Sequence, residues 1–321
     1  FLAMGASVFA VAGSSGTTSQ WRPLLKVPGI VDVAGPRADG RLVLSTHGGL
    51  FLLRSGNSLQ PFARGPQGYL GSVGEPYLTL SPGRRLPSAK CSFRRDDVFI
   101  LEPGSKPGVI RVDRSGRSRR FTDFPSGSFP AGIAFDGVGR FGFRLLVTSS
   151  AGGKTTLYAI DCRGRPRVVT HDAPVVEGGI AVAPRSFGRF AGELIAADEH
   201  SGRIFAFGSR GVVRLVAESG LPAGGDIGVE ALGFVPRGGG AGYLADLGAP
   251  GSPTVGTDSL LVLQGRDLAR ARLRAGDLVG ATEAGARTIA LRCARRCTIR
   301  RVGVGPVATH GEGHITFALS R

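Results

Sequence analysis

The chain has 321 residues, and its 40 Lys and Arg against 24 Asp and Glu give a formal net charge of +16 at pH 7. These charges are spread along the chain without base-stacking aromatics or a groove-binding helix, so we expect no nucleic-acid partner. The 52 Gly and 20 Pro residues interrupt apolar runs instead of forming low-complexity tracts, which excludes a disordered chain and favours a turn-rich β protein.

Residues 1–20 begin with an apolar stretch of signal-peptide length and continue as a polar linker. Ala10-Val11-Ala12 satisfies the small-residue rule for a cleavage site, although no basic residue precedes the apolar run. We interpret 1–20 as the remnant of a signal peptide with its linker, the alternative being a buried first strand or helix. No later window is long and apolar enough to span a membrane. We therefore expect an exported protein in which 21–321 form a single domain.

The remainder of the chain repeats a unit of roughly 45 residues, a period typical of propeller blades. Each unit contains short apolar runs separated by turns that carry Asp, Gly, Ser and Pro. The six unit starts are expected at Gly29–Val33, Glu75–Leu80, Gly132–Phe135, Gly179–Val182, Glu230–Phe234 and Gly313–Phe317. The sequence therefore predicts an all-β fold, a β-propeller of six blades with four antiparallel strands each.

The last two units are expected to depart from this pattern. The fifth is expected to continue with the strands Tyr243–Asp246 and Ser259–Leu263, followed by a short helix within 266–279. The strands Thr288–Leu291 and Thr298–Val302 are expected to fill the rest of units five and six. Because the sixth unit ends soon after its first strand, Trp21–Val27 is expected to close the ring as the outer strand of the last blade.

The four cysteines allow three disulfide pairings. Cys293 and Cys297 flank a three-residue turn without a second pair of ligands nearby, which favours a local disulfide over a zinc site. Cys91 and Cys162 lie in loops of adjacent units that emerge at the same face, so we predict a second disulfide between them. An exported protein meets the oxidising conditions that such bonds require.

Three segments carry a resemblance to a known family: Pro130–Asp136, Glu177–Val182 and Asp198–Phe205. They resemble blade openings and hairpins of TolB-like six-bladed propellers, which include the NHL-repeat and regucalcin/gluconolactonase groups. The resemblance covers roughly residues 25–320 and implies the fold more strongly than an activity. It also implies a metal near the channel axis, held in the regucalcin/gluconolactonase group by one Glu with Asn and Asp residues. This chain has a single Asn, Asn57 in a third-to-fourth turn, so that ligand set is not reproduced.

Acidic and imidazole side chains gather in two classes of loop. The turns between second and third strands and the connections between blades emerge at one mouth of the channel. The candidate ligand-binding residues in these loops are Glu75, Glu177, Glu230, His47, Asp198 and His200. A ring of carboxylates in a basic protein indicates a cation site, since hard cations such as Ca²⁺ take oxygen ligands.

The segment His310-Gly-Glu312-Gly-His314 is the sharpest local pattern. In an extended strand its three polar side chains share one face, and two imidazoles with a carboxylate can bind Zn²⁺. The candidate metal ligands are Glu177, Glu230, His310, Glu312 and His314, for Ca²⁺ or Zn²⁺. The alternative is a glycine-rich turn whose polar side chains bond the backbone. Asp198-Glu199-His200-Ser201 is expected to be a capped turn, because adjacent residues do not form a catalytic triad.

Three functions remain open from the sequence. The first is an exported propeller that binds a small molecule or peptide at the channel mouth, with or without a divalent cation. The second is a metal-dependent lactone or ester hydrolase, and the third is a protein-interaction scaffold. The net charge further favours association with anionic cell-envelope polymers.

Overall fold

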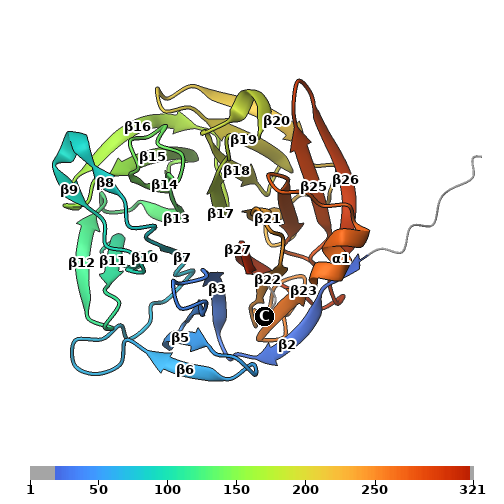
Figure 1. Ribbon diagram of the computed structural model, residues 1–321, viewed down its shortest axis with the longest axis horizontal. Coiled ribbons are helices and arrows are strands. Elements are labelled where there is room, and N and C mark those ends of the chain that lie inside the picture. The colour runs from blue at the N-terminus through green and yellow to red at the C-terminus, as the bar shows by residue number, and fades with distance from the viewer. Residues whose placement is uncertain (1–18, 319–321) are drawn as a thin grey trace, which may run out of the picture.

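The computed structural model describes residues 19–318, so the expected signal-peptide remnant lies outside the described residues except for Ser19 and Gln20. Antiparallel sheets are arranged radially around a central axis, as in a propeller (Figure 1). The predicted all-β propeller is confirmed. Four sheets have four strands each. The last two units share a nine-stranded sheet, because a single parallel bridge between Leu232 and His314 joins them.

The first four units follow the chain in order, with the first strand of each nearest the axis (Figure 1). The first unit consists of β3 (Ile30–Ala34), β4 (Leu42–Thr46), β5 (Gly49–Leu53) and β6 (Leu59–Phe62). The second consists of β7 (Leu78–Leu80), β10 (Val98–Glu102), β11 (Gly108–Val112) and β12 (Ser118–Asp123), with β8 (Arg85–Leu86), η1 (Pro87–Ala89) and β9 (Cys91–Ser92) inserted after β7. The third consists of β13 (Phe129–Phe135), β14 (Leu145–Ala151), β15 (Lys154–Ile160) and β16 (Pro166–Ala173). The fourth consists of β17 (Glu177–Val182), β18 (Leu194–Asp198), β19 (Arg203–Phe207) and β20 (Val213–Glu218), with η2 (Gly188–Phe190) between β17 and β18.

The last two units exchange strands in a way the sequence analysis did not predict. Unit five consists of β21 (Val229–Phe234), β24 (Leu278–Thr282), β25 (Thr288–Cys293) and β26 (Cys297–Val304), with β1 (Ser19–Gln20) added beside β26. Unit six consists of β27 (Gly311–Ala318), β22 (Ala241–Asp246), β23 (Ser259–Leu263) and β2 (Arg22–Lys26). The assignment of 243–246 and 259–263 to the fifth unit was therefore wrong, because the chain crosses to unit six after β21 and returns through α1 (Gly265–Arg270). The closure of the ring by the N-terminal strand is confirmed, since β2 pairs with β23.

Burial decreases from the axis to the rim of each unit. The second strands β4 and β18 are almost wholly buried, because neighbouring units cover both of their faces. The outer strands β12 and β20 instead consist mostly of exposed and half-buried positions, with one buried residue each. Apolar runs in the sequence therefore mark the inner strands, and mixed runs mark the rim.

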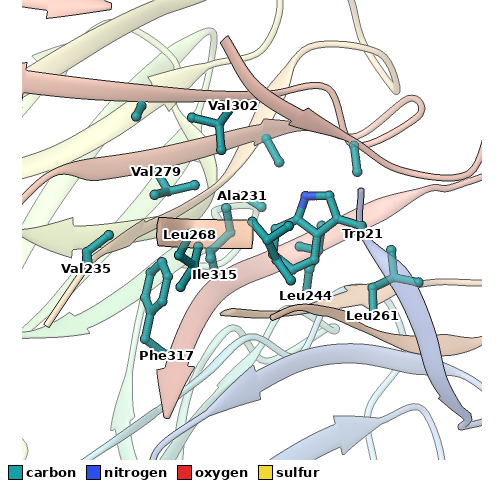
Figure 2. Close-up of a cluster of buried hydrophobic side chains, with 14 residues drawn as sticks. Trp21, Ala231, Val235, Leu244, Leu261, Leu268, Val279, Val302, Ile315 and Phe317 are labelled. Atoms are coloured by element: carbon teal, nitrogen blue, oxygen red, sulfur yellow. The ribbon is translucent and has the colours of Figure 1, made fainter. Parts of the chain in front are cut away.

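Trp21 anchors the N-terminal strand between units five and six. Its side chain is 2% exposed and packs in a cluster with Leu244, Leu261 and Ile315 (Figure 2). The indole Nε1 donates a hydrogen bond to Thr288 Oγ1 at 2.8 Å. Trp21 lies between β1 and β2, and Thr288 opens β25, so this contact joins the N-terminal segment that closes unit six to unit five.

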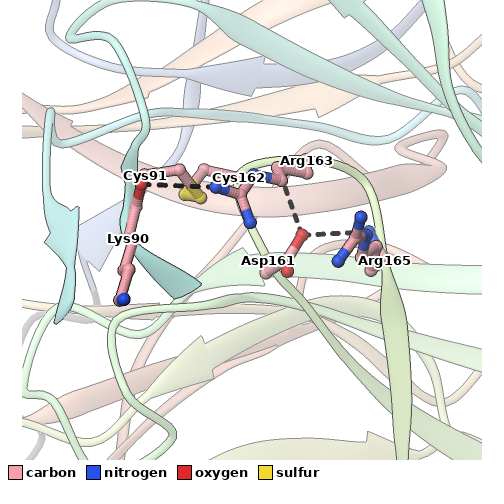
Figure 3. Close-up of a disulfide and its surroundings, with 6 residues drawn as sticks. All are labelled: Lys90, Cys91, Asp161, Cys162, Arg163 and Arg165. Carbon is pink, nitrogen blue, oxygen red and sulfur yellow. Dashed lines mark hydrogen bonds between the residues drawn. A yellow bond between two sulfur atoms is a disulfide. The ribbon is translucent and has the colours of Figure 1, made fainter. Parts of the chain in front are cut away.

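Both predicted disulfides are present, Cys91–Cys162 and Cys293–Cys297. The first joins the insertion of unit two to the third-to-fourth turn of unit three, where Arg163 also donates to the Lys90 carbonyl (Figure 3). Asp161 holds that turn by accepting from the backbone N–H groups of Arg163 and Arg165. The bond therefore fixes the irregular insertion to a well-formed turn.

Removing the Cys91–Cys162 bond by a Cys→Ser double substitution is expected to lower the free energy of unfolding by roughly 2–4 kcal/mol. The bond spans 71 residues, whereas Cys293–Cys297 spans four, and a longer closed loop restricts the unfolded chain more. Urea denaturation of the two double variants tests this difference. An equal or larger loss on removing Cys293–Cys297 would contradict the loop-length argument.

Within 19–318, no helix is long and apolar enough to cross a membrane.

Candidate functional site

Six of the nine glutamates of the chain gather at one mouth of the channel. We call this set, with Tyr77 and His310, the acidic mouth; its glutamates are Glu75, Glu177, Glu199, Glu230, Glu283 and Glu312. Three of them lie in the loop classes expected from the sequence, the connections between units and the second-to-third turns: Glu75, Glu199 and Glu283. The other three lie in the opening residues of first strands: Glu177 in β17, Glu230 in β21 and Glu312 in β27. Among the described residues no Arg or Lys forms an ion pair with them, although the chain carries 40 basic residues.

Tyr77 occupies the centre of this set. The residue is completely buried, and its hydroxyl lies 2.9 Å from Glu75 Oε2 and 2.6 Å from Glu312 Oε2. It also contacts Glu230 Oε1, so one side chain of unit two reaches glutamates of units five and six. A hydroxyl donates only one hydrogen bond, and the other two contacts therefore need protons on the carboxyl groups.

The pKa values of these carboxyl groups agree with a proton-rich cluster. Burial, followed by the charges of Glu312 and Glu177, raises the pKa of Glu75 well above its usual range. Burial and the charges of Glu312 and Glu283 do the same to the pKa of Glu230. For Glu177 and Glu199 the same causes, burial first, raise the pKa to about 7 and about 8. The cluster therefore holds protons near neutral pH that an exposed glutamate would have lost.

His310 lies at the side of the cluster, between two carboxylates. Its Nε2 is 2.8 Å from Glu283 Oε1 and 3.2 Å from Glu312 Oε1. Although burial lowers the pKa of His310, the hydrogen bonds to Glu283 and Glu312 raise it to about 10. His310 is therefore an imidazolium at neutral pH, and its ring cannot act as a proton acceptor.

Three groups within the acidic mouth have donor atoms close enough to share one cation. They are Glu283 with His310 and Glu312, Glu75 with Glu230 and Glu312, and Glu199 with Glu230 and Glu283. In each group the donor atoms lie within 4.8 Å of one another, which fits ligands around Ca²⁺ at 2.3–2.6 Å. Glu283 Oε2 and His310 Nδ1 are both buried, and neither has a hydrogen-bond partner among the described residues. The donor set therefore fits a divalent cation and leaves a carboxylate oxygen for it.

Glycines in the inner strands make room for these side chains. A Cβ atom on Gly178, which has φ +75°, would lie 2.1 Å from Glu230 Cγ. The Glu-Gly-Gly sequence that opens β17 thus lets the carboxylate of β21 pack directly against a neighbouring backbone. A larger residue at 178 would displace Glu230 from Tyr77.

His314 does not join His310 and Glu312, contrary to the expectation that all three project together. Its Nδ1 lies 2.8 Å from Asp32 Oδ2 and its Nε2 lies 2.9 Å from the Ile133 carbonyl. Gly313 adopts φ +67°, and the pairing with β22 is irregular here, which turns His314 away from the mouth. His314 instead joins units six, one and three inside the channel.

The remaining candidates lie around the mouth rather than in the cluster. Asp198 accepts from the backbone of His200 and from Ser201 Oγ, so it caps its own turn as the capped-turn interpretation predicts. His200 is exposed beside Glu199, 3.1 Å from Nδ1 to Oε1. His47 borders a shallow hollow of about 570 Å³ with Leu70 and Val73, and its Nε2 lies 3.0 Å from the Gly74 carbonyl.

Two central residues were missed by sequence reasoning. Tyr77 stands two residues after Glu75, but an aromatic in an apolar run gave no sign of a polar role. Glu283 follows β24 as Glu199 follows β18, but the prediction that 243–246 form the second strand of unit five places Glu283 outside the second-to-third turns. Correct strand assignment is the signal that identifies it.

No family model matches the chain, and no curated protein sequence does. Solved propellers do match: the calcium-binding protein regucalcin from Agrobacterium tumefaciens at 10% identity has a TM-score of 0.55, covering 94% of this chain and 83% of that one. A putative TolB from the same organism at 12% identity has a TM-score of 0.53, covering 88% and 83%. Virginiamycin B lyase from Staphylococcus aureus at 10% identity has a TM-score of 0.50, covering 86% and 72%. The resemblance to TolB-like and regucalcin propellers is thus confirmed at the level of the fold.

Proposed function

We propose that this chain is an exported propeller whose acidic mouth binds a divalent cation and, through it, a small molecule or peptide with oxygen donors. The observation that carries the proposal is the unpartnered, buried Glu283 Oε2 within six glutamates that no Arg or Lys neutralises among the described residues. His310 supplies one positive charge for these six carboxyl groups, and either protons or a cation must compensate the rest, because uncompensated buried carboxylates are costly. The regucalcin neighbour, named as a calcium-binding protein, is consistent with the second form of compensation.

Ca²⁺ suits this donor set better than Zn²⁺. Two of the three groups offer only carboxylate oxygens, the ligands of a hard cation. The third group includes His310, which would have to lose a proton before it could bind a metal. Its two carboxylate neighbours raise the pKa of His310 to about 10, so the ring keeps that proton at neutral pH. We therefore assign the cation to the oxygen-only groups around Glu230.

Apolar side chains around the same mouth favour a ligand that is partly apolar. Three loops expose four apolar side chains: Leu70 (83%), Val73 (74%), Val255 (55%) and Val307 (91%). All four lie in connections between units or in the second-to-third turn of unit six, the loop classes that form the acidic mouth. Such side chains, next to a cation, would contact the apolar part of a ligand whose oxygens approach the metal.

Two disulfides within the described residues support export, because such bonds persist in oxidising compartments. The apolar sequence of 1–13 adds to this argument at the level of sequence alone.

Glu177 supports a second candidate function, metal-dependent hydrolysis of an ester or lactone. This glutamate is only partly buried, and its pKa of about 7 matches a proton acceptor that works at neutral pH. A bound cation would supply polarisation of a substrate oxygen. In that case Glu177→Gln abolishes hydrolysis but retains cation binding.

Metal analysis of the purified protein with melting curves in Ca²⁺ and in chelator tests the proposal. One bound Ca²⁺ per chain and a lower melting temperature in chelator are expected, because a cation that binds only the folded state stabilises it. Ester and lactone screens in the same buffers separate binding from turnover. Absence of metal with identical melting curves would reject the cation site and leave a protein-interaction scaffold.

A further inference from the structure

The two ends of the strands differ sharply in charge. In each unit the first-to-second and third-to-fourth connections lie at the strand ends opposite to the acidic mouth, and we call these connections the basic face. They are residues 35–41, 54–58, 81–97, 113–117, 136–144, 161–165, 183–193, 208–212, 235–240, 264–277 and 294–296. These segments contain 24 of the 40 Arg and Lys residues and nine carboxylates. The loops at the acidic mouth contain three basic residues, Arg64, Lys106 and Arg287.

The folded chain thus gathers charges that the sequence shows as scattered. The strand order explains how, because every second turn of an antiparallel blade returns to the same end. The net charge of the protein is carried almost entirely by one end of the molecule, while glutamates occupy the other. The part of the sequence argument against a nucleic-acid partner that relies on dispersed charges no longer holds for this face, whereas the expected association with anionic cell-envelope polymers gains a defined surface.

Arginine-lined hollows open on the basic face. A cavity of about 480 Å³ between units one and two is lined by Arg84 and Arg95, together with the hydroxyls of Thr79 and Ser81. Between units three and four, cavities of about 280 and 420 Å³ share Arg140 and include Arg210 and Arg185, respectively. These five arginines are exposed, and none forms an ion pair with a described residue. Arg185 donates a hydrogen bond to the Val138 carbonyl, and Arg84 lies over the Phe143 ring. The hollows therefore offer an anionic group chiefly the guanidinium groups of Arg95, Arg140 and Arg210.

We propose that the basic face binds a linear polymer that carries phosphate groups, with successive phosphates in the arginine-lined hollows. Such binding would hold the propeller on an anionic envelope polymer with the acidic mouth directed outward. The proposal does not rest on the cation site, since no residue is shared between the two ends.

The shape and composition of the face distinguish this partner from other polyanions. A bilayer surface is flat and does not enter separate hollows, and among the strongly exposed large apolar side chains of the described residues only Val212 lies on the basic face. Nucleic-acid recognition uses exposed aromatics for stacking or a helix for the groove. No aromatic is among the strongly exposed large apolar side chains in the described part of the chain, and α1 has six residues. A flexible phosphate chain fits free arginines without either feature.

Binding of the full chain to inorganic polyphosphate, measured by titration at several salt concentrations, tests the proposal. The key variant is Arg95→Ser/Arg140→Ser/Arg210→Ser, and the matched control is Arg64→Ser/Lys106→Ser/Arg287→Ser, which removes the same charge from the acidic mouth. We expect saturable binding that the first variant weakens about tenfold or more, with a shallower salt dependence, and that the control changes less than about twofold. Phosphatidylglycerol vesicles and duplex DNA at equal phosphate concentration form the comparison arms.

Equal weakening by both triple variants would overturn the proposal, because it would show attraction by net charge alone. Tighter binding to vesicles or to DNA than to polyphosphate would overturn it in favour of those partners, and absence of saturable binding would overturn it outright. Should the key variant fail to fold, hydrogen exchange of the wild-type chain decides the question. Protection by polyphosphate must then fall on the segments around Arg95, Arg140 and Arg210 and not on the acidic mouth.

Discussion

Replacing Glu312 with Gln is expected to abolish the stabilisation of the propeller by Ca²⁺. Its Oε1 lies beside His310 and its Oε2 beside Tyr77, so this one carboxylate links two of the three cation-binding groups. Gln keeps the shape but removes the charge, and at a Ca²⁺ concentration of a thousand times the dissociation constant the loss corresponds to about 4 kcal/mol. Urea denaturation with and without Ca²⁺ measures this difference.

The stability of the same variant without Ca²⁺ provides a second test of the cation site. In chelator at pH 8, Glu312→Gln is expected to change the stability far less than in Ca²⁺, because the loss of the ion pair with His310 is offset by the removal of one of several mutually repelling charges. A variant that merely packs badly would lose stability in both buffers. Glu102→Gln is the matched control, since Glu102 lies at the same mouth, at the end of β10, but accepts a hydrogen bond from Ser72 outside the cluster. Full Ca²⁺ stabilisation of Glu312→Gln would refute the assignment of the cation to this cluster.

The sequence predicted those features that depend on short-range pattern. Turn residues and apolar runs located the first four units, and the positions of Cys91 and Cys162 within their units were sufficient to predict the disulfide. The outer strand from Trp21 followed from the need to cover an open edge. These inferences need only the alternation of strands and turns.

Features that depend on which of two possible strands a given strand pairs with were not predictable from the sequence. The strands 241–246 and 259–263 have the same apolar pattern whether they pair with β21 or with β27, and only tertiary packing decides. The misplacement then hid Glu283. The predicted orientation of His314 was wrong for a related reason. Between Glu312 and Thr316, β27 has three residues where β22 has one, so side chains two residues apart no longer share a face.

Without a bound cation, the protein is expected to lose stability as pH rises from about 5 to about 9. The pKa of Glu177 is raised to about 7 and that of Glu199 to about 8, so the folded chain keeps protons that the unfolded chain releases above its ordinary glutamate pKa of 4.5. His310, with a pKa of about 10 instead of 6.5, acts in the same direction at the upper end. Because the folded state binds more protons throughout this window, the free energy of unfolding falls with rising pH.

A shift of two to three pKa units in a single group corresponds to roughly 3 kcal/mol, so urea denaturation in chelator at pH 5 and at pH 9 should differ by at least about that amount. Ca²⁺ is expected to reduce the difference, because it replaces the protons that compensate the buried carboxylates, and its stabilising effect should be larger at pH 8 than at pH 5. Glu177→Gln/Glu199→Gln should flatten the profile without Ca²⁺. Stability that rises between pH 5 and pH 9 in chelator would show that these carboxyl groups are compensated by something other than protons, and the proton-rich cluster around Tyr77 would have to be abandoned.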